Sequence, residues 1–294
     1  MPTREYATSQ FGDPELTPEQ AYAACYDGET RVLTRRGFRY FRDVTDEDEV
    51  ATRRADGVIE YHHPIAHHRF PYHGRMYHFR NLSVDLLVTP DHQMLALRNG
   101  ARYLRRGKVE VVPQLVSAER IASSAQAWAV PVHAYWVGDR QPTMEQPVRC
   151  TPEEWSAFVG LWLAEGHVES TRGSHRVAVT QAVGPHTAPI HRIIDGLGVK
   201  YSTLAHKGGP DSKLPAERYR FSHPVIWAWL SKLGKSPERF IPRDLLQAPR
   251  EVLNALLMGL WLGDGSKSKS HVVYTTTSKQ LAEDVAELGI KLGC

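Results

Sequence analysis

The hydrophobic and polar positions follow two different patterns, on either side of a polar stretch at residues 138–150 that contains two prolines. Before this stretch, short runs rich in Val, Thr, Tyr and Phe are separated by Asp-Gly or Asn-Gly pairs, which predicts β-strands joined by tight turns. The expected strands are Thr30–Thr34, Val58–Tyr61, Arg75–Arg80, Leu86–Thr89 and Val109–Pro113. The pattern predicts an all-β domain from Cys25 to about residue 140.

Beyond Cys150 the apolar residues recur at helical spacing. One helix is expected to begin after Thr151, with Pro152 at its first position, and to stop at Gly166. The other expected elements are helices at Ile190–Leu197, Pro224–Leu233, Ala248–Gly265 and Ser278–Leu292, and strands at Arg176–Val183, Tyr201–Leu204, Arg218–Phe221 and His271–Thr277. The chain is thus predicted to be an α+β multidomain protein.

Length and composition fit this division. With 294 residues, of which 41% are hydrophobic, the chain is long enough for about two domains. Residues 1–24 are polar and predict only a short helix started by Thr17 and Pro18, so we expect a leader segment there. The net charge of +3 permits a nucleic-acid partner without requiring one.

Cysteine usage argues against two classes of small-domain stabilisation. The three cysteines, Cys25, Cys150 and Cys294, form no CxxC pair, so neither a disulfide framework nor a cysteine zinc site is expected. This cysteine usage favours a reducing, cytoplasmic location. No membrane partner is expected, because no apolar run approaches the length of a bilayer span. The run His62–His73 lacks cysteine or carboxylate partners at zinc spacing and is expected to form exposed strand and loop.

A seven-residue motif occurs twice in the second part, as GLWLAEG at Gly160–Gly166 and as GLWLGDG at Gly259–Gly265. One copy could be ordinary helix core ended by a glycine, but two copies predict a duplicated half-domain. Gly160 and Gly259 remove side chains from their helices at about 1 kcal/mol each relative to alanine. That cost is tolerable where another backbone approaches closely, so the two helices are expected to pack side by side.

The acidic residues of the motif, Glu165 and Asp264, are expected in the last helical turn, where the helix dipole disfavours negative charge. If the helices are parallel, the two carboxylates meet at one end and repel each other. A divalent cation relieves both penalties. Two hard oxygen ligands with room for water and a phosphate oxygen suit Mg²⁺, which would promote phosphodiester hydrolysis.

The stretches FVGLWLAEG and LLMGLWLGDG resemble the signature helices of the LAGLIDADG homing endonucleases, and the resemblance covers Thr151 to Cys294. It implies a pseudo-symmetric α/β endonuclease domain at residues 150–294, with Glu165 and Asp264 as catalytic acids that hold Mg²⁺. It also implies saddle-shaped sheets lying in the major groove of a double-stranded DNA target site. IPRDL at Ile241–Leu245 and TTTSKQLAEDV at Thr275–Val285 are similar to the family too.

Three lysines accompany this resemblance. Lys235 lies where intein endonucleases often carry a basic residue near the active site. Lys267 and Lys269, just past the second acid, are expected to contact phosphates rather than to catalyse.

The β part resembles inteins, which belong to the wider Hint fold. The resemblance rests on CYDGETRVLTRRGFRYFRDVTDEDEVAT from Cys25 and on DLLVTPDHQMLALRNG at Asp85–Gly100. It implies a horseshoe-like Hint splicing domain over residues 25–140, residues 1–24 as the N-extein leader, and self-splicing without a cofactor.

The chemistry of that site needs three groups. A thiol at Cys25 can attack the preceding carbonyl and turn the Ala24–Cys25 amide into a thioester. Amide nitrogen is a poor leaving group, so His92 is expected to protonate it, while Thr89 orients the scissile peptide or hydrogen-bonds the developing oxyanion. The flanking extein on the Ala24 side is then the substrate.

Splicing also needs a C-terminal part with a further histidine, a terminal asparagine and a following nucleophile, and these are not in the sequence. In the repeat, the first half continues past Gly198 to Leu233, whereas only Cys294 follows Gly293, so we expect an incomplete second half and a missing C-terminal intein partner. Two other readings stay open: a LAGLIDADG-type DNA-binding module that does not cut, and a Hint module that cleaves itself without splicing, which the absence of a signal peptide disfavours.

Overall fold

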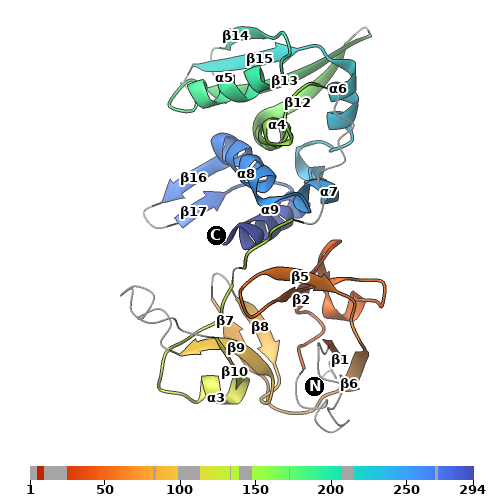
Figure 1. Ribbon diagram of the computed structural model, residues 1–294, viewed down its shortest axis with the longest axis vertical. Coiled ribbons are helices and arrows are strands. Elements are labelled where there is room, and N and C mark those ends of the chain that lie inside the picture. Colours follow the sequence, from red (N-terminus) through yellow and green to blue (C-terminus); the bar gives the residue numbers. More distant parts are fainter. Residues whose placement is uncertain are drawn as a thin grey trace. The chain divides into compact units, whose positions relative to one another are not determined.

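The computed structural model describes residues 5–9, 25–81, 84–98, 113–132, 134–138, 148–171, 173–206, 215–268 and 271–294. The chain forms two compact units, residues 1–135 and 136–294 (Figure 1). The division falls just before the polar stretch at 138–150, most of which lies outside the described residues. Each unit is described by itself below.

The first unit consists mainly of short antiparallel strands. One sheet has the order β3-β2-β4-β5, a second has the order β10-β9-β11, and β1-β6 and β7-β8 form separate pairs. The elements are β1 Glu5–Ser9, β2 Arg31–Thr34, β3 Gly37–Tyr40, η1 Phe41–Asp43, β4 Val50–Arg53, β5 Ile59–His62, β6 His67–Pro71, β7 Tyr77–Arg80, β8 Asp85–Val88, β9 Gln93–Arg98, β10 Gln114–Ser117, α3 Ala118–Ala122 and β11 Trp128–Ala129.

Most of the strand predictions for this unit are confirmed. The runs beginning at Thr30, Val58, Arg75 and Leu86 coincide with β2, β5, β7 and β8. Asp56-Gly57 forms the turn between β4 and β5, with Gly57 at a φ of 91° that a residue with a side chain rarely adopts. The expected strand at Val109–Pro113, apart from its last residue, and the helix expected at Thr17 lie outside the described residues.

The structure adds to two expectations for this unit. Residues 5–9, within the expected leader segment, form β1 and pair in antiparallel register with β6, because an edge strand offers unpaired backbone groups to any neighbouring extended segment. The unit is also not purely β. The short helix α3 begins at the N-cap Ser117, whose hydroxyl accepts from Arg120 N, and its Ala118 packs in a core cluster with Val88 and Met94.

The second unit alternates helices and strands. Its main sheet is antiparallel with the order β12-β13-β15-β14, and β16-β17 is a hairpin. The elements are α4 Pro152–Glu165, β12 Gly166–Thr171, β13 Ser174–Ala182, α5 Thr187–Gly196, β14 Ser202–His206, β15 Ala216–Phe221, α6 Pro224–Ser231, η2 Ser236–Glu238, α7 Arg243–Leu246, α8 Arg250–Asp264, β16 Gly265–Ser268, β17 His271–Tyr274 and α9 Lys279–Leu292. No described helix is long and apolar enough to cross a membrane.

All the helices and strands expected here occur, with ends shifted by a few residues. Thr151 caps α4 in a reciprocal capping box with Glu154, which adds one hydrogen bond to the cap predicted from the sequence. The sequence pattern missed β12 and β16, which follow α4 and α8 directly. In both places the glycine that ends the motif has extended backbone, so the chain passes from helix to strand without a loop.

Gly166 and Gly265 are required because there is no room for a side chain at either position, and not because their backbone is left-handed. A Cβ on Gly166 would collide with the ring of Trp162, and one on Gly265 would collide with the ring of Trp261. Each tryptophan stands four residues before its glycine, one helical turn back. The tryptophan and final glycine of the motif therefore form one packing unit, and this unit is used twice.

Helices α4 and α8 pack side by side, as the repeat predicted (Figure 1). Their contacts advance in the same direction along both helices, so the pair is parallel. Ser156 Oγ donates to Val252 O at 2.9 Å near their N-terminal ends. A Cβ on Gly160 would lie 2.8 Å from Leu260 N, and one on Gly259 would lie 2.7 Å from Leu161 N, with backbone carbonyls closer still. The two glycines thus allow the backbones to touch.

The main sheet has one covered and one open face. On the covered face, the rings of Phe158 and Phe221 lie 5.9 Å apart and those of His191 and Tyr219 lie 4.9 Å apart, so α4 and α5 pack on β15. Trp155 contacts Trp229 at 5.1 Å, which adds α6 to the same layer. The residues that alternate with these point to the opposite face.

A buried ionic network fixes α9 to the rest of the unit. Glu287 accepts from Arg243 at 2.6 and 2.9 Å and pairs with Lys291 at 2.8 Å. Asp284 accepts from Ile241 N at 2.8 Å, and Lys291 Nζ donates to Leu246 O at 2.6 Å. The IPRDL stretch therefore acts structurally, because its backbone and Arg243 satisfy acids that would otherwise be buried alone.

Substituting Gly160 or Gly259 by alanine is expected to lower the free energy of unfolding of the second unit by about 2–4 kcal/mol, because each methyl group would overlap backbone atoms of the facing helix. Thermal unfolding of each variant measures this. Gly289→Ala is the matched control: Gly289 lies within α9 and a Cβ there meets nothing within 4 Å, so this variant should gain about 0.5–1 kcal/mol. Equal effects of all three substitutions would contradict the close approach of α4 and α8.

Candidate functional sites

The last turns of α4 and α8 place Glu165 and Asp264 at the same end of the helix pair. A Cβ on Gly263 would meet Ala164 and would lie 2.9 Å from Glu165 Cγ, so the helix ends are in direct contact there. Both carboxylates are half-buried. The parallel arrangement, on which the expected meeting of the two acids depended, therefore brings them together.

The electrostatics of this pair disfavour two negative charges. Burial, with the charge of Asp264 as second cause, raises the pKa of Glu165 to about 7. Burial also raises the pKa of Asp264. The surrounding protein therefore does not fully stabilise the negative charge of either carboxylate. Raised carboxylate pKa values of this kind are common where an acid binds a cation or transfers a proton.

Two polar side chains beside the acids were missed by sequence reasoning. Gln181 Nε2, at the end of β13, donates to Glu165 Oε1 at 3.2 Å, to Leu262 O at 3.1 Å and to Gly263 O at 3.3 Å. His186 Nδ1 lies 3.0 Å from Leu262 O. Both reach across to carbonyls in the last turn of α8. No local sequence signal points to them, because their role depends on where β13 ends relative to the helix pair.

The basic side chain near the acids is Arg239, four residues after Lys235. Arg239 is buried, donates to Leu163 O at 2.7 Å and to Gly166 O, and stacks 4.8 Å from the Trp162 ring. It satisfies carbonyls that the end of α4 leaves unpaired. Burial lowers the pKa of Arg239, and the two acids partly offset that effect.

The described lysines that the sequence singled out are exposed and do not contact the acid pair. Lys235 is exposed and occupies the N-cap position of the short helix η2 without a side-chain capping hydrogen bond. Lys267 is exposed on β16, and Lys269 lies outside the described residues. None of the contacts that the structure assigns to the acids involves Lys235 or Lys267.

The donor set at the helix ends fits a hard divalent cation. Two carboxylates meet there, each with its pKa raised by burial, and carbonyls of the final helical turns lie beside them. Oxygen donors of this kind are what Mg²⁺ prefers. Glu165 and Asp264 are the residues that would hold it.

A second constellation lies in the first unit and brings Cys25, Thr89 and His92 together. Cys25 N donates to Thr89 Oγ1 at 3.0 Å, and Thr89 N donates back to Cys25 O at 3.0 Å. His92 N donates to Thr89 O at 3.2 Å. All three are buried, with 4%, 1% and 7% of their surface exposed. Residues 64 positions apart thus share one site.

Aromatic packing orients the histidine of this site. The rings of Tyr26 and His92 meet edge to face at 4.2 Å, and Tyr26 stacks on Phe41 at 4.8 Å. Burial raises the pKa of the Cys25 thiol, so the reactive thiolate is disfavoured until a base takes the proton. Cys150 and Cys294 lie elsewhere and have no comparable setting.

The histidine-rich run is spread over β5, a loop and β6. His62 pairs with Glu60 at 3.2 Å and His67 with Asp46 at 3.1 Å, so these rings face different acids. Among the residues that the structure describes, no group of three or more His, Cys, Asp or Glu side chains could hold a metal ion. The expectation of strand and loop at this run is confirmed.

A family model of the LAGLIDADG-like domain matches residues 251–294, which span α8, β16, β17 and α9. This part of the chain is therefore LAGLIDADG-like, and it includes Asp264. The chain is also similar to part of a homing endonuclease, I-DmoI in complex with DNA and Mn, with 20% identity, 47% of this chain and 77% of that chain covered, and a TM-score of 0.35.

Three curated proteins share sequence with the chain. A Clp protease proteolytic subunit of Chlamydomonas moewusii is 25% identical over 92% of this chain. A section of an RNA polymerase β subunit of Stigeoclonium helveticum is 28% identical over 51%, and the replicative helicase DnaB of a Nostoc strain is 38% identical over 22%. The matches cover 28%, 14% and 9% of those proteins, so the chain spans less than a third of their length.

The second unit is expected to lose stability as pH rises from about 4.5 to above 7 when divalent ions are absent. The folded state raises the pKa of Glu165 to about 7 and so binds this proton more tightly than the unfolded state, and that stabilisation disappears as the proton leaves. Thermal unfolding in EDTA between pH 5 and pH 8 measures the slope.

Glu165→Gln should flatten this slope and reduce the gain in melting temperature that Mg²⁺ gives at pH 8. Glu153→Gln, a change to an exposed acid in the first turn of the same helix, should leave both unchanged. A wild-type stability that rises with pH over this range would contradict the assigned environment of Glu165.

Proposed function

We propose that the chain is part of an intein, in which a Hint-type self-processing domain over residues 25–140 is joined to a site-specific, Mg²⁺-dependent double-strand DNA endonuclease over residues 150–294. On this proposal residues 1–24 are the end of the N-extein, and the protein works in the cytoplasm. The observation that carries it is the presence of two separate reactive groups in one chain: the acid pair at the ends of α4 and α8 in the second unit, and the Cys25 site in the first unit.

The endonuclease half is supported by the acid pair and by the family match. Bound at Glu165 and Asp264, Mg²⁺ would supply an activated water and charge stabilisation for phosphodiester hydrolysis. The chain's own groups prepare the site. Gln181 fixes the Glu165 carboxylate, and Arg239 holds the end of α4 in place through its carbonyls. Each half of the repeat contributes one acid, which suits cleavage of two strands.

The self-processing half is supported by the hydrogen bond between Cys25 N and Thr89 Oγ1 at 3.0 Å. This nitrogen belongs to the bond that an acyl shift breaks, so Thr89 holds the scissile peptide in position. Of the two roles weighed for Thr89, the geometry favours this one over stabilisation of the oxyanion, because its oxygen accepts from the amide.

The proposed reaction moves one acyl group. The Cys25 sulfur forms a bond to the Ala24 carbonyl carbon, the bond between that carbon and Cys25 N breaks, and the thiol proton is transferred so that the nitrogen leaves as an amine. His92, held in the same buried site, is the group that moves the proton. The product is a thioester, and no cofactor is consumed.

The similar proteins support an inserted element. A protease subunit, an RNA polymerase subunit and a helicase have no common catalytic activity, yet each contains a stretch resembling this chain that makes up a minor share of its length. A sequence that recurs inside functionally unrelated hosts is expected of a self-removing insertion, and not of a domain that serves the host's own reaction.

The splicing half predicts cleavage by an external thiol or hydroxylamine. The full chain treated with dithiothreitol near pH 8 is expected to release residues 1–24, detected by mass spectrometry, because the thioester at Cys25 is open to attack while the amide is not. Cys25→Ala should abolish release, and His92→Ala or Thr89→Ala should slow it by about 10²-fold or more. Cys150→Ser is the matched control and should cleave normally. Release from Cys25→Ala would rule out the proposed nucleophile.

The endonuclease half predicts metal-dependent cutting of duplex DNA. Incubated with a randomised plasmid library and Mg²⁺, the full chain should linearise a sequence-specific subset, which sequencing of the new ends identifies. Glu165→Gln and Asp264→Asn should each lower the rate by about 10³-fold or more while retaining DNA binding in Ca²⁺.

Asp195→Asn, which changes an exposed acid on α5, is the control and should cut at the wild-type rate.

The second candidate function is a DNA-binding module that does not cut. It predicts that the wild-type chain and all these variants bind DNA without cleaving it. The two raised carboxylate pKa values favour the cutting form.

A further inference from the structure

The two acids of the repeated motif differ in how their carboxylates are held. Glu165 accepts a hydrogen bond from Gln181 Nε2 at 3.2 Å. Asp264 accepts no hydrogen bond from the part of the chain that the structure describes. Carboxylates that bind a metal ion are usually oriented by a hydrogen bond of their own. The second acid therefore lacks the donor that the first acid has.

The register of the two hairpins identifies the corresponding positions in the two copies of the repeat. Opposite the glycine that follows each acid stands Val179 in the first copy and Tyr274 in the second. Side chains two positions apart on a strand share a face, so Gln181 lies on the same face as Val179. The second copy thus has a tyrosine, in place of valine, directly across from the residue after Asp264.

The residue that corresponds to Gln181 in the second copy has a different task. It is Thr276, two positions after Tyr274. The Thr276 hydroxyl oxygen accepts a hydrogen bond from Ser278 N at 3.2 Å, in the turn that leads into α9. A hydrogen-bond donor for Asp264 is therefore expected from another side chain of this copy.

Tyr274 and Arg239 each have one buried polar atom without a hydrogen-bond partner among the described residues. These atoms are the Tyr274 hydroxyl oxygen and Arg239 Nε. The other two guanidinium nitrogens of Arg239 donate to Leu163 O and Gly166 O, so only Nε is left. Buried polar atoms are rarely left unpaired, and an exception at a reactive site calls for a functional explanation.

Both atoms belong to the surroundings of the acid pair. Ser278 Oγ, four residues after Tyr274, donates to Arg239 O at 2.6 Å and so holds the arginine near the end of β17. Burial raises the pKa of the Tyr274 hydroxyl, and the charge of Asp264 raises it further. Burial lowers the pKa of Arg239, and Tyr274 is the first of the neighbours that offset this. The tyrosine thus stays protonated and can act as a donor.

We propose that Tyr274 positions Asp264 for cation binding: its hydroxyl group accepts from Arg239 Nε and donates to the Asp264 carboxylate, directly or through one water molecule. A hydroxyl group can accept and donate at once, so both unpartnered atoms are satisfied in this arrangement. The inference rests on the proposed endonuclease function. Tyr274 is a positioning residue, because it acts on the cation through Asp264.

The proposal makes the two acids equivalent in chemistry although their partners differ. Gln181 offers an uncharged amide donor to Glu165, and Tyr274 offers an uncharged hydroxyl donor to Asp264. An uncharged donor orients a carboxylate without neutralising it, so the negative charge stays available to a cation. A direct ion pair with Arg239 would instead compete with the metal ion for that charge.

The test removes only the hydroxyl group, by Tyr274→Phe in the full chain. The melting temperature is measured near pH 8 in EDTA and over a series of Mg²⁺ concentrations, which gives an apparent Mg²⁺ affinity. We expect Mg²⁺ to bind about tenfold more weakly, because residues that orient a metal ligand commonly have effects of this size. In EDTA the melting temperature should stay the same or rise slightly, since the hydroxyl group has no partner to lose.

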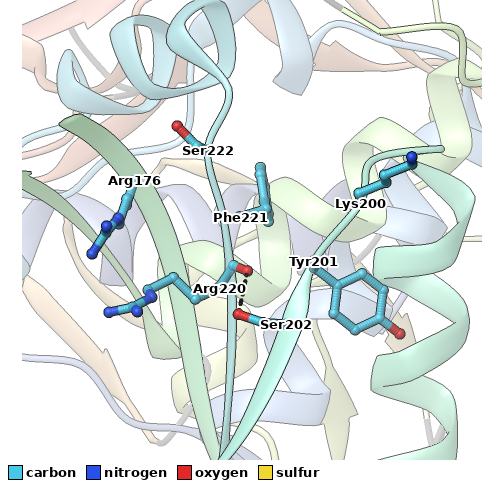
Figure 2. A pocket seen from close by; sticks show the side chains of 7 residues that line it. All are labelled: Arg176, Lys200, Tyr201, Ser202, Arg220, Phe221 and Ser222. Carbon is cyan, nitrogen blue, oxygen red and sulfur yellow. Dashed lines mark hydrogen bonds between the residues drawn. The ribbon is translucent and has the colours of Figure 1, made fainter.

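Tyr201→Phe is the matched control, because it removes a tyrosine hydroxyl group from the same unit and leaves the acid pair untouched. Tyr201 stands just before β14, where it lines a separate pocket with Lys200 and Phe221 (Figure 2). Its hydroxyl group donates to Asp195 Oδ1 at 2.9 Å. This variant should bind Mg²⁺ with wild-type affinity, and any loss of melting temperature should be the same in EDTA and in Mg²⁺.

Three results would overturn the inference. Wild-type Mg²⁺ affinity in Tyr274→Phe would show that the hydroxyl group does not hold Asp264, and an equal fall of its melting temperature with and without Mg²⁺ would assign a purely structural role. A loss of Mg²⁺ affinity in Tyr201→Phe as large as that in Tyr274→Phe would make the effect unspecific. If the wild-type chain gains no stability from Mg²⁺ and Glu165→Gln changes nothing, the proposed endonuclease site itself fails, and this inference with it.

Discussion

The backbone contact between α4 and α8 is the constraint on which the second unit depends. Because Gly160 and Gly259 lack side chains, the two helices approach until their backbones touch, and they do so in parallel. This geometry brings Glu165 and Asp264 to one end, where burial raises both pKa values and the charge of Asp264 raises that of Glu165 further. The close contact of α4 and α8 thus stabilises the fold and also brings together two carboxylates whose negative charge a cation could neutralise.

The surroundings of the acid pair show how the unit tolerates that deficit. Arg239 donates hydrogen bonds to carbonyl oxygens at the end of α4 rather than to the two carboxylates. Gln181 donates both to Glu165 and to a carbonyl in the last turn of α8, and so links the two helix ends. Farther away, Arg243 and Lys291 neutralise the buried Glu287 completely. The unit therefore contains two kinds of buried acid. Those of α9 form ion pairs that stabilise the fold, whereas those of the repeated motif have no such basic partner among the described side chains.

The two candidate sites differ in the way they are assembled. The acid pair comes from two copies of one motif, so symmetry brings it together. The Cys25 site comes from segments far apart in sequence, joined by the reciprocal backbone and hydroxyl hydrogen bonds of Cys25 and Thr89. Its cysteine is buried, and this burial raises the pKa of the thiol.

The sequence by itself determined the local structure and the duplicated motif, because capping residues, glycine spacing and apolar periodicity act over a few residues. It therefore predicted the ends of α4, the side-by-side packing of the two motif helices and the candidate acids Glu165 and Asp264. Only the tertiary structure revealed the contacts of Gln181 and Arg239 with the ends of α8 and α4, since each side chain reaches atoms far away in the chain. It also decided β12 and β16, which carry no strand periodicity of their own and are extended because each pairs with the strand that follows it.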